Sequence, residues 1–354
     1  MEKKCLVAMS GGVDSSVAAL MIKKQNFAAV GATMKLIGET VPVNHNHACC
    51  SLDDIKNAKS VCDILGMEHY VFDFSEHFCE KVVDKFISSY EMGATPNPCI
   101  DCNRYLKFEK LFKEAESLSC SFIATGHYAR VEKCGDKFLL KKAVDETKDQ
   151  SYVLYSLTKE QLSRTIFPLG DMTKTESRAI AAENNFVNAD KQDSQDICFV
   201  KDEDYTDFIR RYTKKDYPSG DFIDKKGNIL GTHKGIISYT IGQRKGLGLS
   251  LPAPLYVCEI NSQNNTVTLC PHEELFTKEL IAKDINLIAV DDLYSPMRLK
   301  AKVRYRHKEE DAVACQIDEN TLRVVFDKPQ RAITKGQAVV LYDGDTVIGG
   351  GTIN

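Results

Sequence analysis

Residues 4–16 read KCLVAMSGGVDSS, and this stretch decides the fold of the first half of the chain. The apolar run up to Met9 predicts a buried strand, the Gly-Gly pair a sharp turn, and the spacing from Asp14 onward a helix. Such a turn aims backbone N–H groups outward beside a helix N-terminus, which predicts a phosphate site. Neither G-x-x-x-x-G-K-[ST] nor G-x-G-x-x-G occurs in the chain. An ordinary strand–helix turn is the alternative, but the carboxyl edge of a sheet favours a ligand site.

The rest of the first half alternates strands with helices. Further strands are expected at residues 27–34, 69–74 and 122–125, helices at 51–65, about 75–92 and about 103–118, and a proline-broken loop at 93–100. This alternation requires a parallel sheet with helices on both faces. The predicted fold class is therefore α/β, with a doubly wound parallel sheet.

The pattern of alternating strands and helices ends at about residue 200. A helix with a basic end is expected at 201–215, a Gly- and Pro-rich stretch follows, and short alternating segments then appear at 256–260, 266–269, 298–306, 312–317, 322–326, 338–341 and 347–352. These segments predict an antiparallel barrel or sandwich. We expect three domains: the parallel sheet over 1–200, a small central α+β domain over 201–278, and the C-terminal β-domain over 279–354.

Composition excludes several classes of protein. The 354 residues are 43% hydrophobic and 27% charged, which excludes a disordered chain. No run approaches the roughly 18 apolar residues of a spanning helix, and no signal peptide is evident, so a soluble cytoplasmic protein without a membrane partner is expected. A net charge of −4 excludes a globally basic nucleic-acid binder but permits a local basic face. The 13 cysteines indicate reduced core thiols and a few reactive ones, because a disulfide framework belongs to secreted chains.

Two segments suggest sulfur chemistry. Residues 95–103 read TPNPCIDCN and precede the helix expected from about residue 103, whose N-terminal dipole favours the thiolate of Cys102. The C-x-x-C spacing also occurs in metal and cluster sites, which need further ligands. Cys198, in the polar segment DSQDICF at 193–199, is one candidate. From these residues alone, a nucleophile and a metal ligand both stay open.

Further motifs carry a resemblance to a known family. They are ATGHYA at 124–129, KDQSY at 148–152 and IGQRKGLG at 241–248. The pattern S-G-G-V-D-S resembles the loop of the ATP pyrophosphatase (PP-loop) superfamily, which cleaves ATP between its α and β phosphates. Together with T-P-N-P-x-x-x-C-N and D-S-x-x-I-C-F, these motifs closely resemble the bacterial tRNA-specific 2-thiouridylase family over essentially the whole chain. The resemblance implies a PP-loop domain, a central tRNA-contacting domain and a C-terminal β-barrel.

The resemblance also implies roles for individual residues. Residues implied to line the ATP site are Ala8, Met9, Ser10, Gly11, Gly12, Val13, Asp14, Ser15, Met34 and Gly126. Residues implied to face the target base are Asn97, Pro98 and Cys99, and the implied catalytic pair is Cys102 and Cys198. Residues implied to touch tRNA are His127, Lys148, Asp149, Gln150, Arg304, Tyr305 and Gln337.

The reaction implied by the resemblance is 2-thiolation of the wobble uridine of tRNA. ATP with Mg²⁺ adenylates the C2 oxygen, pyrophosphate leaves into the loop, and sulfur then displaces AMP. The implied partners are the wobble-uridine tRNAs for Lys, Glu and Gln and a sulfur-donor protein. A PP-loop ligase that forms an amide or guanidino bond is an alternative, but it has no need for paired reactive cysteines. An inert RNA-binding module has no need for the loop with Asp14.

Cys99 departs from the family pattern, because many members carry an Asp with an acid–base or base-positioning role there. Two schemes for sulfur transfer stay open. In the first, Cys198 carries a persulfide, and a disulfide between Cys102 and Cys198 remains after transfer. In the second, Cys99, Cys102 and Cys198 hold three irons of a [4Fe–4S] cluster whose fourth iron binds a sulfide.

Other residues with chemical potential are expected to be structural. No structural zinc pattern has the spacing of His45, His47, Cys49 and Cys50, so these four are expected to be loop residues. Cysteines in apolar runs, expected in the core, are Cys5, Cys62, Cys120, Cys258, Cys270 and Cys315. Residues 298–308 alternate basic and apolar side chains on an expected strand, which predicts either a solvated face or a surface for phosphates.

Overall fold

The computed structural model describes residues 3–38, 51–192, 197–200 and 204–354. The chain divides into two units, the first made of residues 1–82, 99–203 and 345–347 and the second of residues 83–98, 204–344 and 348–354. His45, His47, Cys49 and Cys50 lie outside the described residues. Within the described residues, no helix has the length and apolar character needed to cross a bilayer.

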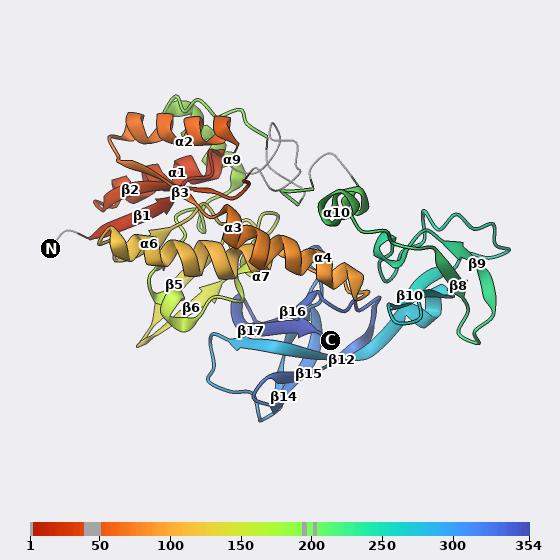
Figure 1. The fold of residues 1–354 in the computed structure, drawn as a ribbon. Helices are drawn as coiled ribbons and strands as arrows, with labels where there is room; N and C mark the ends of the chain where they lie inside the picture. Colours follow the sequence, from red (N-terminus) through yellow and green to blue (C-terminus); the bar gives the residue numbers. More distant parts are fainter. Residues whose placement is uncertain (1–2, 39–50, 193–196, 201–203) are drawn as a thin grey trace. The chain divides into compact units, whose positions relative to one another are not determined.

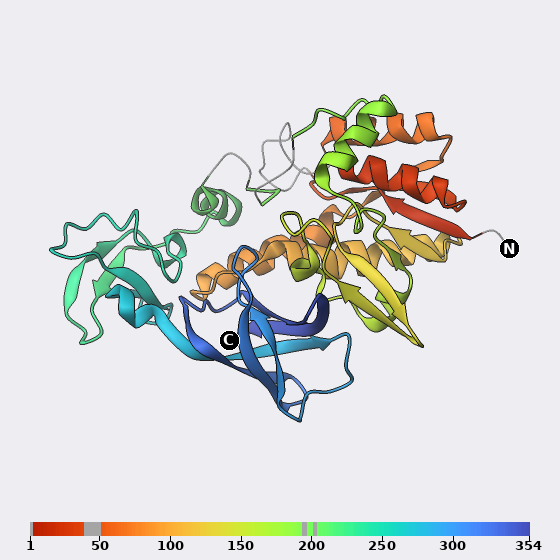
Figure 2. The ribbon, with the colours of Figure 1, turned by 180° about the vertical axis from the view of Figure 1, so that it is seen from behind.

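The first unit is built on a five-stranded parallel sheet in the order β3-β2-β1-β4-β7. Its strands are β1 (Lys4–Ala8), β2 (Ala28–Lys35), β3 (His69–Asp73), β4 (Phe122–Ala124) and β7 (Thr165–Ile166). Helices α1 (Val13–Lys24), α2 (Leu52–Leu65) and α9 (Lys174–Glu183) cover one face, and α6 (Leu111–Ser117) lies on the other (Figures 1 and 2). The predicted doubly wound α/β fold is confirmed.

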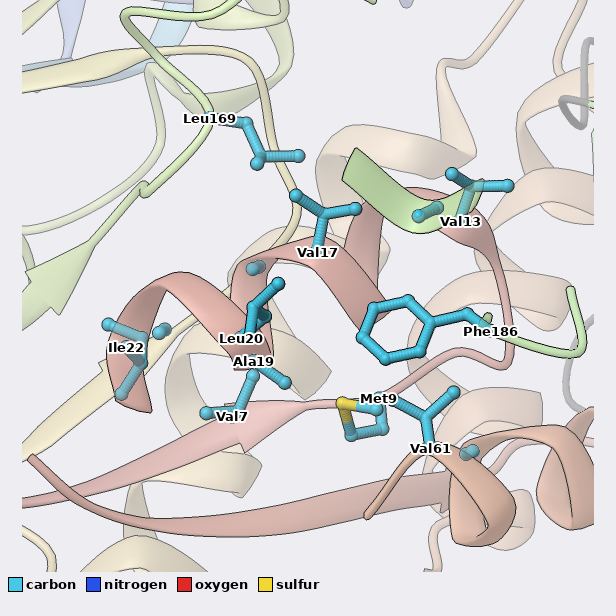
Figure 3. Close-up of a cluster of buried hydrophobic side chains, with 14 of the residues drawn as sticks. Val7, Met9, Val13, Val17, Ala19, Leu20, Ile22, Val61, Leu169 and Phe186 are labelled. Atoms are coloured by element: carbon cyan, nitrogen blue, oxygen red, sulfur yellow. The ribbon is translucent and has the colours of Figure 1, made fainter. Parts of the chain in front are cut away.

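The core under α1 explains why β1 and α1 meet in a fixed way. Alternation along β1 puts Val7 and Met9 on the same face, where they pack with Val17 and Ile22 of α1 and Phe186 (Figure 3). Burying each such side chain stabilises the fold by about 1.5–3 kcal/mol. The turn between β1 and α1 is therefore held at both ends by buried side chains.

Two long helical segments contain π-helical turns. The first consists of α3 (Ser75–Phe78), η1 (Cys79–Val83) and α4 (Asp84–Glu91), and the second of α5 (Pro98–Asp101), η2 (Cys102–Lys110) and α6. The expectation that the second helix starts near residue 103 is wrong. This helix begins at Pro98. Proline is favourable at the first position of a helix, because the backbone N–H that it lacks would have no partner within the helix there. Cys102 therefore lies inside the helix.

The remaining elements of the first unit are short. They are the hairpin of β5 (Arg130–Cys134) and β6 (Lys137–Lys141), and the helices α7 (Ser151–Leu154) and α8 (Lys159–Ser163). The hairpin was not predicted, because its strands are too polar to show a buried face. Thr346, the first residue of β17 (Thr346–Ile353), pairs with Lys141 of β6.

The second unit contains a helix, a small sheet and a barrel. Helix α10 (Tyr205–Thr213) precedes a four-stranded sheet in the order β10-β11-β8-β9. Its strands are β8 (Gly220–Ile223), β9 (Ile229–His233), β10 (Tyr256–Asn261) and β11 (Thr266–Cys270), and 3-10 turns lie at η3 (Ile236–Ser238) and η4 (His272–Leu275).

The C-terminal strands close into a barrel, which decides between the barrel and the sandwich. The strands are β12 (Phe276–Leu287), β13 (Met297–Lys302), β14 (Glu310–Asp318), β15 (Thr321–Arg331), β16 (Ala338–Asp343) and β17, and β12 pairs with β17 to complete the ring. The strand expected at 298–306 ends at Lys302. Because β14 begins at Glu310, opposite Ala301, the residues after Lys302 have no partner in that strand.

Candidate functional site

The turn between β1 and α1 is a backbone cradle. Gly11 has φ +70°, and a Cβ on it would lie 2.3 Å from the carbonyl oxygen of Asp54, so only glycine fits. Gly12, the N-cap of α1, has no side chain that could cap the first-turn N–H groups. These N–H groups and the helix dipole together favour an anion at this place.

Side chains fix the carbonyl groups of this turn. The Ser15 hydroxyl donates to the Gly12 oxygen over 3.0 Å, and the Ser10 N–H donates to Ser15 Oγ over 3.2 Å. The Asn188 amide donates to the Gly11 oxygen and to Ser16 Oγ, both over 3.0 Å. Lys191 Nζ lies 3.3 Å from the same Gly11 oxygen. Asn188 and Lys191 were not predicted from the sequence.

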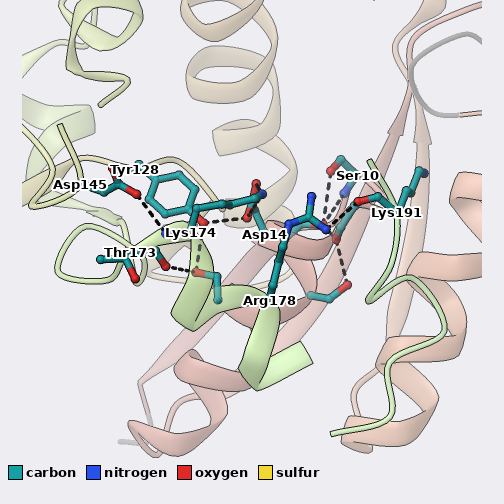
Figure 4. Close-up of polar contacts among 12 residues, drawn as sticks. Ser10, Asp14, Tyr128, Asp145, Thr173, Lys174, Arg178 and Lys191 are labelled. Atoms are coloured by element: carbon teal, nitrogen blue, oxygen red, sulfur yellow. Dashed lines mark hydrogen bonds and ion pairs between the residues drawn. The ribbon is translucent and has the colours of Figure 1, made fainter. Parts of the chain in front are cut away.

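Asp14 carries the charge of the turn and is held by two side chains (Figure 4). Lys174 Nζ lies 2.7 Å from Oδ1 and 2.8 Å from Oδ2, and the Tyr128 hydroxyl donates to Oδ1 over 2.9 Å. Tyr128 belongs to the ATGHYA motif, but Lys174 was missed. The capping box of Thr173 and Glu176 marks the start of its helix, yet nothing local points to Asp14.

Gly126 lies against the same turn. A Cβ on Gly126 would come within 2.7 Å of the Asp14 carbonyl carbon and 2.8 Å of the Ser15 nitrogen. The end of β4 and the β1–α1 turn therefore meet at the carboxyl edge of the sheet. Four other residues expected in the ATP site have buried side chains: Ala8, Met9, Val13 and Met34.

His127 is a buried, neutral imidazole. It is 8% exposed, its Nδ1 lies 2.7 Å from Thr125 Oγ1, and Lys107 Nζ lies 3.4 Å from its Nε2. Burial, and secondarily the Lys107 charge, hold the pKa of His127 well below its ordinary value. Nε2 therefore accepts from Lys107, and the positive charge in this place belongs to Lys107.

The KDQSY motif supports the ATGHYA motif. Gln150 Oε1 accepts from the backbone N–H of Tyr128 over 3.0 Å, and the backbone N–H of Gln150 donates to the carbonyl oxygen of Tyr128 over 2.9 Å. Asp149 accepts from the N–H groups of Ala143 and Ser151. These contacts hold the segment that presents the Tyr128 hydroxyl to Asp14, whereas Lys148 is half-buried.

No cysteine within the described residues forms a disulfide bond. Cys99 is exposed, and Cys102 and Cys198 are half-buried. Phe199, next to Cys198, is buried and packs edge-on against Phe78, with 5.6 Å between ring centroids. Among the core cysteines, Cys5, Cys62, Cys120 and Cys270 are buried as expected, whereas Cys258 and Cys315 are half-buried.

Burial separates inert thiols from accessible ones. Desolvation raises the pKa of Cys62 to about 12, so this thiol stays protonated and unreactive. The described residues contain no group of three or more His, Cys, Asp or Glu side chains placed to hold a metal ion. Cys99, Cys102 and Cys198 are therefore not gathered as a cluster-ligand set.

In the second unit, two expected tRNA-contacting residues are engaged internally. Gln337 Nε2 donates to the carbonyl oxygens of Thr95 and Pro96 over 2.8 and 3.2 Å, which anchors the segment leading to half-buried Asn97 and buried Pro98. Arg304 donates to Thr334 Oγ1 over 2.6 Å and to the Ala332 oxygen. Neighbouring Tyr305 is exposed.

Comparison with known proteins identifies the family. Three family models match the chain. The model described as "tRNA methyl transferase HUP domain" matches residues 3–202, the one described as "tRNA methyl transferase PRC-barrel domain" matches residues 206–271, and the one described as "Aminomethyltransferase beta-barrel domain" matches residues 277–353. A tRNA-specific 2-thiouridylase of Clostridioides difficile (strain 630) is 50% identical over 100% of this chain and 98% of its own. The chain belongs to the tRNA-specific 2-thiouridylase family. The family recognised in the sequence, an enzyme family, is thereby confirmed.

Other members of the 2-thiouridylase family agree with this assignment. The tRNA-specific 2-thiouridylase of Acetivibrio thermocellus is 49% identical over 99% of both chains. Among solved structures, a 4-thiouridine synthetase–RNA complex with bound ATP matches 60% of this chain and 50% of its own, at 16% identity. The TM-score of this match is 0.36. The assignment thus depends on full-length sequence similarity.

Proposed function

We propose that this chain is an ATP-dependent sulfurtransferase that converts the wobble uridine of tRNA to 2-thiouridine, with AMP and pyrophosphate as the other products. The observation that carries the proposal is the geometry of the β1–α1 turn. Side chains donate hydrogen bonds to the carbonyl oxygens of this turn, and Asp14 is held at the edge of its backbone cradle. The proposal includes the expected tRNAs for Lys, Glu and Gln, a sulfur-donor protein and a cytoplasmic location. It also includes the division into domains at 1–200, 201–278 and 279–354.

The first half-reaction is activation of the C2 oxygen. That oxygen attacks the α-phosphorus of ATP, and the α–β bridging oxygen leaves with pyrophosphate. The N–H groups at the start of α1 stabilise the charge that develops on the leaving group, because they are already oriented. The backbone cradle consists of Ser10, Gly11, Gly12 and Ser15. The buried side chains that support it from the core are those of Ala8, Met9, Val13 and Met34.

Magnesium would fit beside the turn. A carboxylate has about four lone-pair positions. Lys174 Nζ contacts both oxygens of Asp14 and Tyr128 contacts one, so, among the residues that the structure describes, a lone-pair position stays open on a side chain that is 33% exposed. When bound, the ion would neutralise phosphate charge, and Asp14 is the residue that would hold it.

The second half-reaction replaces the activated oxygen with sulfur. In the persulfide scheme, the terminal sulfur of a Cys198 persulfide attacks C2, and AMP leaves with the original oxygen. The Cys102 thiolate then attacks the Cys198 sulfur, which releases the sulfur on the base and forms a Cys102–Cys198 disulfide. A two-electron thiol reductant restores both thiols.

We infer that sulfur is transferred by the persulfide scheme and not by a cluster, and two observations support this inference. Cys102 and Cys198 are both half-buried, so each thiol is partly accessible, and the described residues contain no group of three or more His, Cys, Asp or Glu side chains placed to hold a metal ion. We therefore derive no step through a [4Fe–4S] cluster. Exposed Cys99 would then act next to the base, together with Asn97 and Pro98. Many members of the family are expected to carry Asp at the position of Cys99.

The proposal is tested by thiolation of unmodified tRNA with ATP and a persulfide donor. Cys102→Ser and Cys198→Ser should each abolish 2-thiouridine, whereas Cys134→Ser, a change at an exposed thiol, should leave it unchanged. Iron and acid-labile sulfide are measured on anaerobically purified protein. Stoichiometric iron that is lost in Cys99→Ser would replace the persulfide scheme by the cluster, and thiolation by Cys102→Ser would overturn both.

A further inference from the structure

A carboxylate stands at the edge of a cradle that attracts anions. Asp14 is the second residue of α1, so its charge lies among the N–H groups that would receive a triphosphate. An uncompensated carboxylate in this place repels phosphate, because water screens the interaction only in part. The chain therefore needs a positive charge for Asp14 that does not depend on the ligand.

Lys174 supplies that charge from the first turn of α9. Its Nζ lies 2.7 and 2.8 Å from the two oxygens of Asp14, and its side chain is only 11% exposed. Burying an ammonium group costs several kcal/mol unless a partner compensates it. The pairing with Asp14 explains why a lysine is found in this buried place.

The surroundings fix both members of the pair (Figure 4). Tyr128 is 2% exposed, its hydroxyl lies 2.9 Å from Asp14 Oδ1 and 3.0 Å from Ser177 Oγ, and its ring centroid lies 5.8 Å from Lys174 Nζ. The Lys174 N–H donates to Asp145 over 3.1 Å. The pair is thus built in before any ligand arrives.

We propose that Lys174 is the internal counter-cation of Asp14: it cancels the charge of the carboxylate so that the turn accepts a triphosphate, and together with Tyr128 it sets the position of the carboxylate. Lys174 is a positioning residue, because it acts through Asp14. This inference rests on the proposed role of the turn as an ATP site. It distinguishes Lys174 from a lysine that contacts the phosphates directly.

A double-mutant cycle on ATP affinity tests this role. Affinity is measured calorimetrically on the full chain in metal-free buffer, so that no divalent ion competes for Asp14. Lys174→Met should weaken ATP binding about tenfold, because it leaves the Asp14 carboxylate without its counter-cation. Asp14→Asn combined with Lys174→Met should restore the affinity to within about threefold of the wild type. A double variant as weak as Lys174→Met would overturn the inference.

A second variant keeps the test independent of the folding of Lys174→Met, which is monitored by thermal unfolding. Asp14→Asn alone leaves an uncompensated ammonium group and should bind ATP several-fold more tightly in metal-free buffer. Unchanged or weaker binding by this variant would contradict the inference. Lys59→Met is the matched control, because Lys59 pairs with Asp63 on the exposed face of α2. Absence of ATP binding by the wild type would refute the proposed function itself.

Discussion

The side-chain amide of Asn188 donates to the carbonyl oxygen of Gly11 over 3.0 Å, across 177 positions of sequence. This contact turns the Gly11 carbonyl toward the protein and away from the ligand side of the turn. Asn188 is 3% exposed, so solvent cannot replace the bond. The conformation of the turn therefore depends on a residue far from its own sequence.

Asn188→Ala should weaken ATP binding by about 1–3 kcal/mol, because two buried hydrogen bonds are lost and the Gly11 carbonyl is left with fewer partners. The measurement is ATP affinity at constant salt. Asn184→Ala is the control, since the Asn184 side-chain amide donates to the Ile180 oxygen of its own helix. Equal losses in the two variants would show that the contact to Gly11 has no special role.

Gly126→Ala should abolish ATP binding while the protein stays folded. The new Cβ would lie 2.7–2.8 Å from backbone atoms of Asp14 and Ser15, which can move only if the turn moves. Gly135→Ala provides the comparison, because, apart from its two chain neighbours, no heavy atom of the described residues lies within 4 Å of a Cβ at that hairpin position. The expected cost there is about 1 kcal/mol of strain at positive φ. ATP binding by Gly126→Ala at the wild-type level would contradict the position assigned to this glycine.

His127 should make stability depend on pH in the acidic range. Its folded-state pKa is held well below the ordinary value by burial and by Lys107, so the unfolded chain binds the proton first. Stability should therefore fall as the pH drops below about 6.5, by up to about 1.4 kcal/mol per pH unit from this residue. His127→Gln should flatten the profile of unfolding free energy between pH 7 and 5. Parallel profiles would mean that folding does not lower the pKa of His127.

Arg244 and Lys245 should contact tRNA phosphates. Both are exposed in the glycine-rich segment at 241–248, whereas Arg304 is engaged with Thr334 and Ala332. Replacing both by Ala should weaken tRNA binding and reduce the slope of log affinity against log salt by roughly 1–2. Arg298→Ala should have little effect, because Arg298 is paired with Asp327. A double variant with an unchanged slope would exclude this segment from the phosphate contacts.

The elements predicted correctly from sequence are those whose signal is local. Apolar runs in the sequence predict the strands β1 to β4, and the turn at Gly11 follows from two glycines between a strand and a helix. The β5–β6 hairpin was missed, because its side chains are mostly polar or exposed. The helix begins at Pro98, earlier than expected, because proline is common in loops but also suits the first turn of a helix.

The site residues that escaped prediction act across the fold. Lys174 and Asp14 are separated by 160 positions, and only the packing of α9 on α1 brings them together. Sequence pattern places a lysine in the first turn of a helix, but it does not name the carboxylate opposite. The same limit applies to Arg304, which the alternating pattern placed on a strand face. The strand ends at Lys302, and the guanidinium turns inward to Thr334.

The most direct test of the central claim is product analysis of a single reaction containing the full-length protein, unmodified tRNA, ATP and Mg²⁺, with a persulfide donor. We predict tRNA-dependent formation of AMP and pyrophosphate in step with 2-thiouridine at the wobble position. Asp14→Ala should form none of the three while remaining folded. Formation of ADP and phosphate, or of AMP without any sulfur in the tRNA, would contradict the assigned reaction.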